Sequence, residues 1–265
     1  MTVLLATLLG LCVGSFANVF LHRFPAGRSL WRPGSACPHC GHAIRARHNL
    51  PVLGWLLLAG RCYDCGASIR ARYPLIEGAF GVLAGLSTWR LGSDLLALEF
   101  TGYFLALLLI AVVDWESLHI YDVCTYPLGL AGLSLSVQFP GVYGAWWVSA
   151  ACAAGTLALM WALGAAGTAL FKRDALGGGD VKLMAAAAGF LGPAGIIQAL
   201  AFSVVLGLPL MLVYQRRRGL GWREPAPFGP GLCLGCALAG WDLVSGDLSW
   251  ALGRAGLQVL DLRNF

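Results

Sequence analysis

Long apolar runs alternate with short polar segments along the chain, and this pattern predicts a helical membrane protein. The runs cover residues 2–21, 74–89, 95–113, 123–137, 145–171, 183–214 and 228–241. A helix needs roughly 20 apolar residues to cross a bilayer, so the 183–214 run is too long for one pass. Gly192-Pro193 interrupts that run and predicts two passes there. We therefore expect an all-α polytopic protein with about eight transmembrane helices.

Composition excludes an ordinary soluble domain. The 265 residues are 58% hydrophobic and 12% charged, and their mean hydropathy is +0.73. A soluble domain carries about 25% charged residues. The net charge of +5 would suggest nucleic acid in a soluble protein, but here the basic residues are read as topology signals. We expect membrane lipid around the chain and no nucleic-acid partner.

The basic residues also predict sidedness. The segment 22–73 holds eight arginines and one acidic residue, Asp64. The positive-inside rule places this segment in the cytoplasm and the N-terminus in the periplasm. Residues 1–20 lack a basic start and a small-residue cleavage site, which predicts a retained first helix. Counting passes puts residues 114–122, 171–182 and 216–223 inside, provided that the 183–214 run crosses twice.

Four segments follow from this topology. We expect a first transmembrane helix over residues 1–21 and a cytoplasmic four-cysteine loop over 22–73. A transmembrane core then covers residues 74–245, and a C-terminal tail covers 246–265. Residues 49–60, inside the loop, form an apolar stretch that is too short to span. This stretch is expected to lie in the membrane interface or against the helix bundle.

Two CxxC pairs in the loop predict a metal site. Cys37 and Cys40 form the first pair, and Cys62 and Cys65 form the second after 21 intervening residues. This spacing is typical of a four-thiolate zinc ribbon, with a glycine after each pair for the tight turn. The alternative is a set of redox dithiols or disulfides, which the predicted cytoplasmic placement disfavours. We predict structural Zn²⁺ on these four cysteines.

A third CxxC pair, Cys233 and Cys236, has no partner pair and lies in an apolar run. We interpret these two cysteines as small apolar residues that pack inside a helix.

Two carboxylates at the ends of apolar runs predict catalysis. Asp114 closes one run, and Asp180 opens another directly after Gly177, Gly178 and Gly179. A charge near lipid is costly, so acids at this depth indicate function. Two adjacent carboxylates share a proton, so one can activate water while the other donates to an oxyanion. The glycines leave room for a substrate backbone beside Asp180. The pattern favours an intramembrane aspartyl protease.

Other acids receive supporting or structural interpretations. Glu116 and Asp122 lie in the first acidic segment and are expected to act as interfacial or supporting groups. Glu77 lies inside a predicted helix, with Arg70 and Arg72 as candidate partners.

Six motifs in order resemble the bacterial type IV prepilin peptidases, which are bifunctional leader peptidase/N-methyltransferases of the GxGD aspartyl protease group. The motifs are GSFANVFLHR at residues 14–23, the two CxxC pairs, RYPLIE at 72–77, the acidic segment 114–122, GGGDVK at 177–182 and PFGP at 227–230. One departure is Tyr121, where the family usually has proline before the closing Asp122.

The resemblance implies an activity and its partners. It implies an aspartic endopeptidase of the bacterial inner membrane that removes the basic leader of type IV prepilins or type II secretion pseudopilins. Cleavage would fall after Gly at the cytoplasmic face, with Asp114 and Asp180 as catalytic residues. It also implies methylation of the new N-terminus with S-adenosylmethionine. The methyl-donor expectation rests on the resemblance alone, because no GxGxxG fingerprint follows a predicted strand.

Rival interpretations remain open at this point. A transporter could use interfacial acids as proton or cation sites, but it predicts a repeat between the halves and leaves the cysteine loop unexplained. A non-catalytic pilus or secretion assembly factor would hold pilin subunits through the loop and would tolerate loss of either aspartate. A membrane thiol oxidoreductase is disfavoured by the predicted side of the CxxC pairs.

Overall fold

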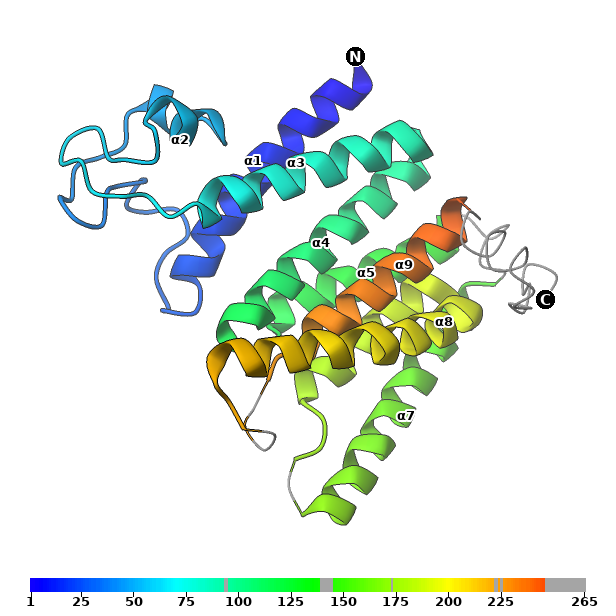
Figure 1. Cartoon of the computed structure of the whole chain (residues 1–265). Helices are drawn as coiled ribbons and strands as arrows, with labels where there is room; N and C mark the ends of the chain where they lie inside the picture. The colour runs from blue at the N-terminus through cyan, green and yellow to red at the C-terminus, as the bar shows by residue number, and fades with distance from the viewer. Residues whose placement is uncertain (93–94, 139–144, 173, 222–223, 225, 246–265) are drawn as a thin grey trace. The chain divides into compact units, whose positions relative to one another are not determined.

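The regular elements of the protein are helices, as the apolar pattern predicts. The computed structural model describes residues 1–92, 95–138, 145–172, 174–221, 224 and 226–245, and the predicted tail 246–265 lies outside this part (Figure 1). Within the described ranges there is no β-strand beyond isolated bridges. The helices are α1 (Thr2–Arg23), η1 (Ala46–His48), α2 (Leu53–Leu57), α3 (Arg72–Leu91), α4 (Leu95–Ser117), α5 (Asp122–Gln138), α7 (Trp146–Phe171), α8 (Gly178–Arg218) and α9 (Gly229–Ser245).

Four of these helices are long and apolar enough to cross a membrane, namely α1, α4, α7 and α8. The prediction of an all-helical membrane protein is therefore confirmed, while the count of eight passes stays a prediction. The backbone of α8 leaves helical geometry at Gly192, where φ is 69° and ψ is −176°. This confirms the predicted break before Pro193, because glycine alone adopts a positive φ at little cost.

The chain divides into two compact units, Met1–Thr101 and Gly102–Phe265. In the first unit, α1 packs along α3 through glycines on both helices. A Cβ atom at Gly14 would lie 2.8 Å from the Cα of Glu77, and one at Gly81 would lie 2.7 Å from the Leu11 side chain. Small residues let the two helix backbones approach closely, which is the usual way apolar helices associate in membranes.

The second unit is built around α8, which packs against α5, α7 and α9. Its core contains Tyr103, whose ring stacks on Phe190 with 4.2 Å between centroids. The Tyr103 hydroxyl donates a 3.1 Å hydrogen bond to the Cys236 carbonyl, so the end of this buried side chain is satisfied. Cys233 and Cys236 are both buried, and the Cys236 thiol contacts the Met184 sulfur at 3.8 Å. The packing interpretation of this third CxxC pair is confirmed.

Candidate functional site

Asp114 lies near the end of α4 and is 5% exposed. Its Oδ2 atom accepts a 3.0 Å hydrogen bond from the backbone N–H of Gly229, the first residue of α9. A Cβ atom at Gly229 would lie 2.6 Å from that same oxygen. Glycine is therefore required at this position for the α9 backbone to reach the carboxylate.

Asp180 lies in the first turn of α8, whose N-cap is Gly177. Its carboxylate accepts a backbone hydrogen bond from Gly177, and the partial positive charge of a helix N-terminus favours an acid there. The negative charges of Asp180 and Asp114 repel each other, and the thiol of Cys233 lies within the field of both. The structure therefore brings together the two carboxylates that the sequence singled out.

The glycines before Asp180 have different surroundings. A Cβ atom at Gly177 would lie 3.1 Å from Oδ2 of Asp180, and one at Gly179 would lie 2.8 Å from the Cβ of Ile120. Gly179 thus permits the first acidic segment to pack directly against the second. A Cβ atom at Gly178 would meet no atom within 4 Å. The role of these glycines in receiving a substrate backbone stays a prediction.

An ion pair also joins the two acidic segments. Lys182 Nζ lies 2.8 Å from both carboxylate oxygens of Asp122, at the start of α5. The side chains are 40% and 47% exposed, so this pair adds little to stability but fixes the register of the two helix ends. Sequence reasoning treated Lys182 as a topology signal and gave Gly229 no role. The motifs GGGDVK and PFGP were the available signals for both residues.

The four cysteine sulfurs of the loop form a compact cluster, with all Sγ atoms within 4.8 Å of one another. Cys37 and Cys65 sulfurs are 3.9 Å apart. Tetrahedral zinc with bonds of about 2.3 Å places its sulfurs about 3.8 Å from each other, so the cluster fits that ion. Thiolates are also the ligands that structural zinc sites use most.

The two CxxC pairs lie in two separate backbone turns of the same kind. The amide of Cys37 donates to the His42 carbonyl at 3.0 Å, and that of Cys62 donates to the Ala67 carbonyl at 2.8 Å. Gly41 and Gly66 have φ values of 73° and 70°, which confirms why glycine follows each pair. These matched turns direct two sulfurs each toward one point.

Backbone hydrogen bonds from Cys40 and His39 lower the pKa of the Cys37 thiol to about 6. The pKa of Cys40 is raised to about 12 and that of Cys65 is also raised, because burial and neighbouring sulfurs outweigh their backbone hydrogen bonds. Cys37 is therefore the thiol of this group that most readily provides a thiolate, the form that binds a metal.

Glu77 of α3 links the cysteine loop to the helices of the first unit. The carboxylate accepts a 2.7 Å hydrogen bond from the Val52 amide and another from the Ser15 hydroxyl. These two donors are partners that the sequence did not suggest. Nearby, the Asn18 side chain donates to the Tyr73 carbonyl at 3.2 Å, which links α1 to the start of α3.

Together these features define a helical membrane protein with two neighbouring aspartates and a four-cysteine cluster of the size that fits a metal ion. The chain belongs to the type IV leader peptidase family, whose model matches residues 101–212. A second model, the bacterial Peptidase A24 N-terminal domain, matches residues 8–91. The N-terminal match lies within the first compact unit, and the other match begins at Thr101, the last residue of that unit.

Several relatives match over most of their length, and each is named prepilin leader peptidase/N-methyltransferase. The relative from Dickeya chrysanthemi is 37% identical over 94% of this chain and 92% of its own. The one from Burkholderia pseudomallei strain 1026b is 36% identical over 88% and 82%. The one from Stutzerimonas stutzeri is 34% identical over 92% and 91%. No solved structure matches the chain.

Proposed function

We propose that this protein is a prepilin peptidase of the bacterial inner membrane. It removes the basic leader of type IV prepilins or pseudopilins after Gly, at the cytoplasmic face. The observation that carries the proposal is the approach of Asp114 and Asp180, which come from the ends of two different helices in a predominantly apolar unit. The names of the relatives supply the substrate class.

The chemistry needs only water and the two carboxyl groups. One ionised carboxylate takes a proton from a water molecule, whose oxygen attacks the scissile carbonyl carbon. The protonated partner donates to the carbonyl oxygen, which gives a tetrahedral intermediate. The carbon–nitrogen bond then breaks and the leaving amine receives a proton. The amides of Gly229 and Gly177 hold the two carboxylates in place throughout.

A zinc ion would be held by Cys37, Cys40, Cys62 and Cys65, and it would serve to fold the loop. Methylation of the new N-terminus with S-adenosylmethionine is the second proposed activity. The relatives' double name supports it.

The test is a processing assay on the purified full-length protein in liposomes with a prepilin substrate. Leader removal is read by mass, with and without S-adenosylmethionine. We expect Asp114→Asn and Asp180→Asn each to lower the cleavage rate at least about 1000-fold, because the shared proton is lost. Asp174→Asn, a change at an exposed acid shortly before α8, is the matched control. A product heavier by one methyl group only with S-adenosylmethionine would establish the second activity.

Cleavage at the wild-type rate by both folded Asn variants would overturn the proposal. The two acids would then be structural, and the active site would lie at other residues. A wild-type protein that cleaves no prepilin would instead favour a transporter or a non-catalytic assembly factor.

A further inference from the structure

A polar cluster lies between α1 and α3 in the first unit and takes no part in the proposed cleavage. It consists of Ser15, Asn18 and Glu77, together with the backbone groups of Val52 and Tyr73 that they contact. Ser15 and Asn18 share one face of α1, because residues three apart are neighbours on a helix. Asn18 is 3% exposed and Glu77 is 9% exposed. The interface therefore keeps an amide and a carboxyl group away from water.

The cluster has more hydrogen-bond acceptors than donors. The amide nitrogen of Asn18 donates to the Tyr73 carbonyl at 3.2 Å, so the nitrogen and oxygen of this side chain have distinct roles. The oxygen, Oδ1, is buried and has no hydrogen-bond partner among the described residues. The Glu77 carboxylate accepts from the Val52 amide and the Ser15 hydroxyl, whereas a carboxylate can accept about four hydrogen bonds. Buried acceptors are seldom left unpaired, so this surplus indicates a ligand that brings donors.

The backbone of the loop is strained where it meets Glu77. Val52 has a φ of 61° and a ψ of −51°, which a β-branched residue rarely adopts. In this conformation its amide donates the 2.7 Å hydrogen bond to the carboxylate. Strained backbone persists only where the surrounding structure holds it, and it is concentrated at ligand sites. The strain therefore favours a binding role for Glu77 over a packing role.

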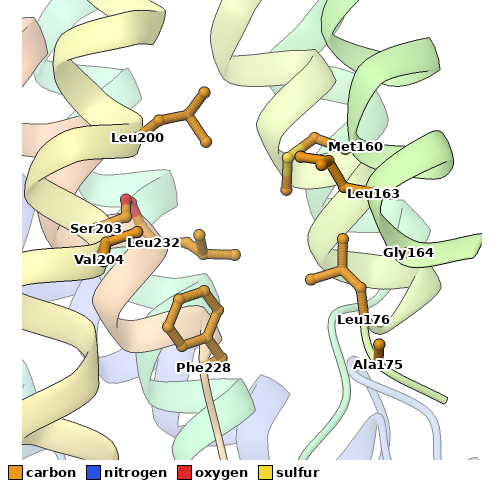
Figure 2. A pocket seen from close by; sticks show the side chains of 10 residues that line it. All are labelled: Met160, Leu163, Gly164, Ala175, Leu176, Leu200, Ser203, Val204, Phe228 and Leu232. Carbon is orange, nitrogen blue, oxygen red and sulfur yellow. The ribbon is translucent and has the colours of Figure 1, made fainter. Parts of the chain in front are cut away.

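The cavity of about 250 Å³ between α7, α8 and α9 in the second unit offers no comparable set of acceptors (Figure 2). Ser203 is the sole polar side chain among the described residues that line it, and its hydroxyl donates to the Leu232 carbonyl at 3.4 Å. A charged ligand group would lose its hydration in that cavity without gaining a partner. The polar cluster of the first unit is the better place for such a group.

We propose that Asn18 and Glu77 bind a primary ammonium group during the proposed methyl transfer. An ammonium carries three N–H donors and a positive charge, which suit the unpaired Asn18 oxygen and the remaining acceptor positions of the carboxylate. The inference rests on the proposed second activity, which the relatives' name supports. Two participants in that reaction carry a primary ammonium, namely the methionine end of S-adenosylmethionine and the new N-terminus of the substrate.

Two variants and one control test the assignment in the purified full-length protein. Glu77→Gln removes the charge with little change in size, and Asn18→Leu removes the amide at similar volume. Thr7→Val is the matched control, because Thr7 of α1 also faces α3, at Gly85, and its hydroxyl donates to Val3 of its own helix. All proteins are compared by thermal unfolding in detergent, by leader cleavage and by methylation.

Binding is measured in two arms, one for each source of the ammonium. The donor arm compares the Kd of S-adenosylmethionine with that of its deaminated analogue, which has hydrogen in place of the amino group. The acceptor arm compares the Kd of the leader-free substrate with that of the same polypeptide acetylated at its N-terminus, which removes the charge.

Loss of the ammonium should weaken binding to wild type at least about 10-fold in one arm, and that arm identifies the source. Glu77→Gln and Asn18→Leu should reduce this difference to less than about threefold and lower kcat/KM for methylation at least about 10-fold. Leader cleavage should stay within about threefold of wild type, since the cluster lies outside the paired aspartates. Thr7→Val should match wild type in both arms.

An ammonium preference that both variants retain would overturn the assignment, as would a wild-type protein without that preference in either arm. Parallel losses of cleavage and methylation in both variants would also overturn it and would indicate a packing role for the cluster. Failure of the proposed function is distinguishable. Wild type that adds no methyl group would remove the second activity itself, whereas normal methylation by both variants would remove only the ammonium site.

Discussion

At Gly229 the functional group is the backbone itself, because its N–H donates to Asp114 while the absence of a side chain makes room for the carboxylate. The hydrogen bond fixes the direction of a buried acid that would otherwise face an apolar interior. Orientation of this kind matters for catalysis, since a misplacement of about 1 Å can cost about 100-fold in rate.

Gly229→Ala should therefore lower kcat/KM for leader cleavage about 100-fold. The new methyl group would overlap Oδ2 of Asp114 and rotate or displace that carboxylate. The matched control is Gly102→Ala, because a Cβ atom at Gly102, inside α4, would meet no atom within 4 Å. Both variants are compared by cleavage kinetics and by thermal unfolding in detergent. A Gly229→Ala enzyme within threefold of wild type would contradict this role.

The comparison of Gly229 with Asp114 shows what sequence can reveal at this scale. Asp114 and Asp180 could be predicted because an acid at the edge of an apolar run is costly and therefore conspicuous. Gly229 supplies a backbone N–H, which every residue except proline carries, so no side-chain chemistry marks it. Glu77 was conspicuous for the same reason as the aspartates. Its partner at Val52 is again a backbone amide and could not be identified.

At the scale of elements, the cysteine loop shows the closest agreement between pattern and structure. The spacing within each CxxC pair dictates a turn, and the turn dictates where two sulfurs point. The pairing of the two turns depends on contacts distant in sequence, yet the need for four ligands predicts it. The sequence predicted the structure of the apolar stretch between the pairs less closely. It forms α2, whose Leu53, Leu56 and Leu57 are exposed.

Zinc should bind at one ion per chain and should depend on the loop cysteines. Cys40→Ser removes one of four ligands, so we expect zinc content to fall by at least about half and the loop to become protease-sensitive. Cys12→Ser changes an exposed cysteine of α1 that lies outside the cluster, and it should retain full zinc. Metal is measured by mass spectrometry on the purified chain, and loop folding by limited proteolysis. Full zinc in Cys40→Ser would contradict a four-thiolate site.

At the scale of the whole molecule, the class of fold follows from composition, whereas the division into units does not. Apolar runs identify helices because a membrane leaves the backbone few other ways to satisfy its hydrogen bonds. Along the chain, the boundary between the two compact units falls between Thr101 and Gly102, inside α4. The apolar run continues on both sides of that point and is interrupted only by the single residues Glu99 and Gly102, so the pattern predicts one helix there and no boundary.

The membrane path of α8 is the main open feature of the topology. Its 41 residues would extend about 60 Å if straight, which is twice the roughly 30 Å of a bilayer core. A single perpendicular pass would therefore leave half of an apolar helix in water. The break at Gly192 offers the other solution, in which the chain turns back and returns Arg216, Arg217 and Arg218 to the side of Lys182.

We predict that Gly192 lies on the periplasmic side. Alkaline phosphatase inserted after Gly192, with the rest of the chain retained, should be active, whereas insertions after Leu118 or Gly219 should be inactive. The expectation follows because the basic residues near Lys182 and Arg216–Arg218 hold both ends of α8 in the cytoplasm. Green fluorescent protein at the same positions gives the reciprocal readout and controls for expression. An inactive phosphatase at Gly192, with fluorescence there, would show that α8 does not cross the membrane twice and that the chain has fewer than eight passes.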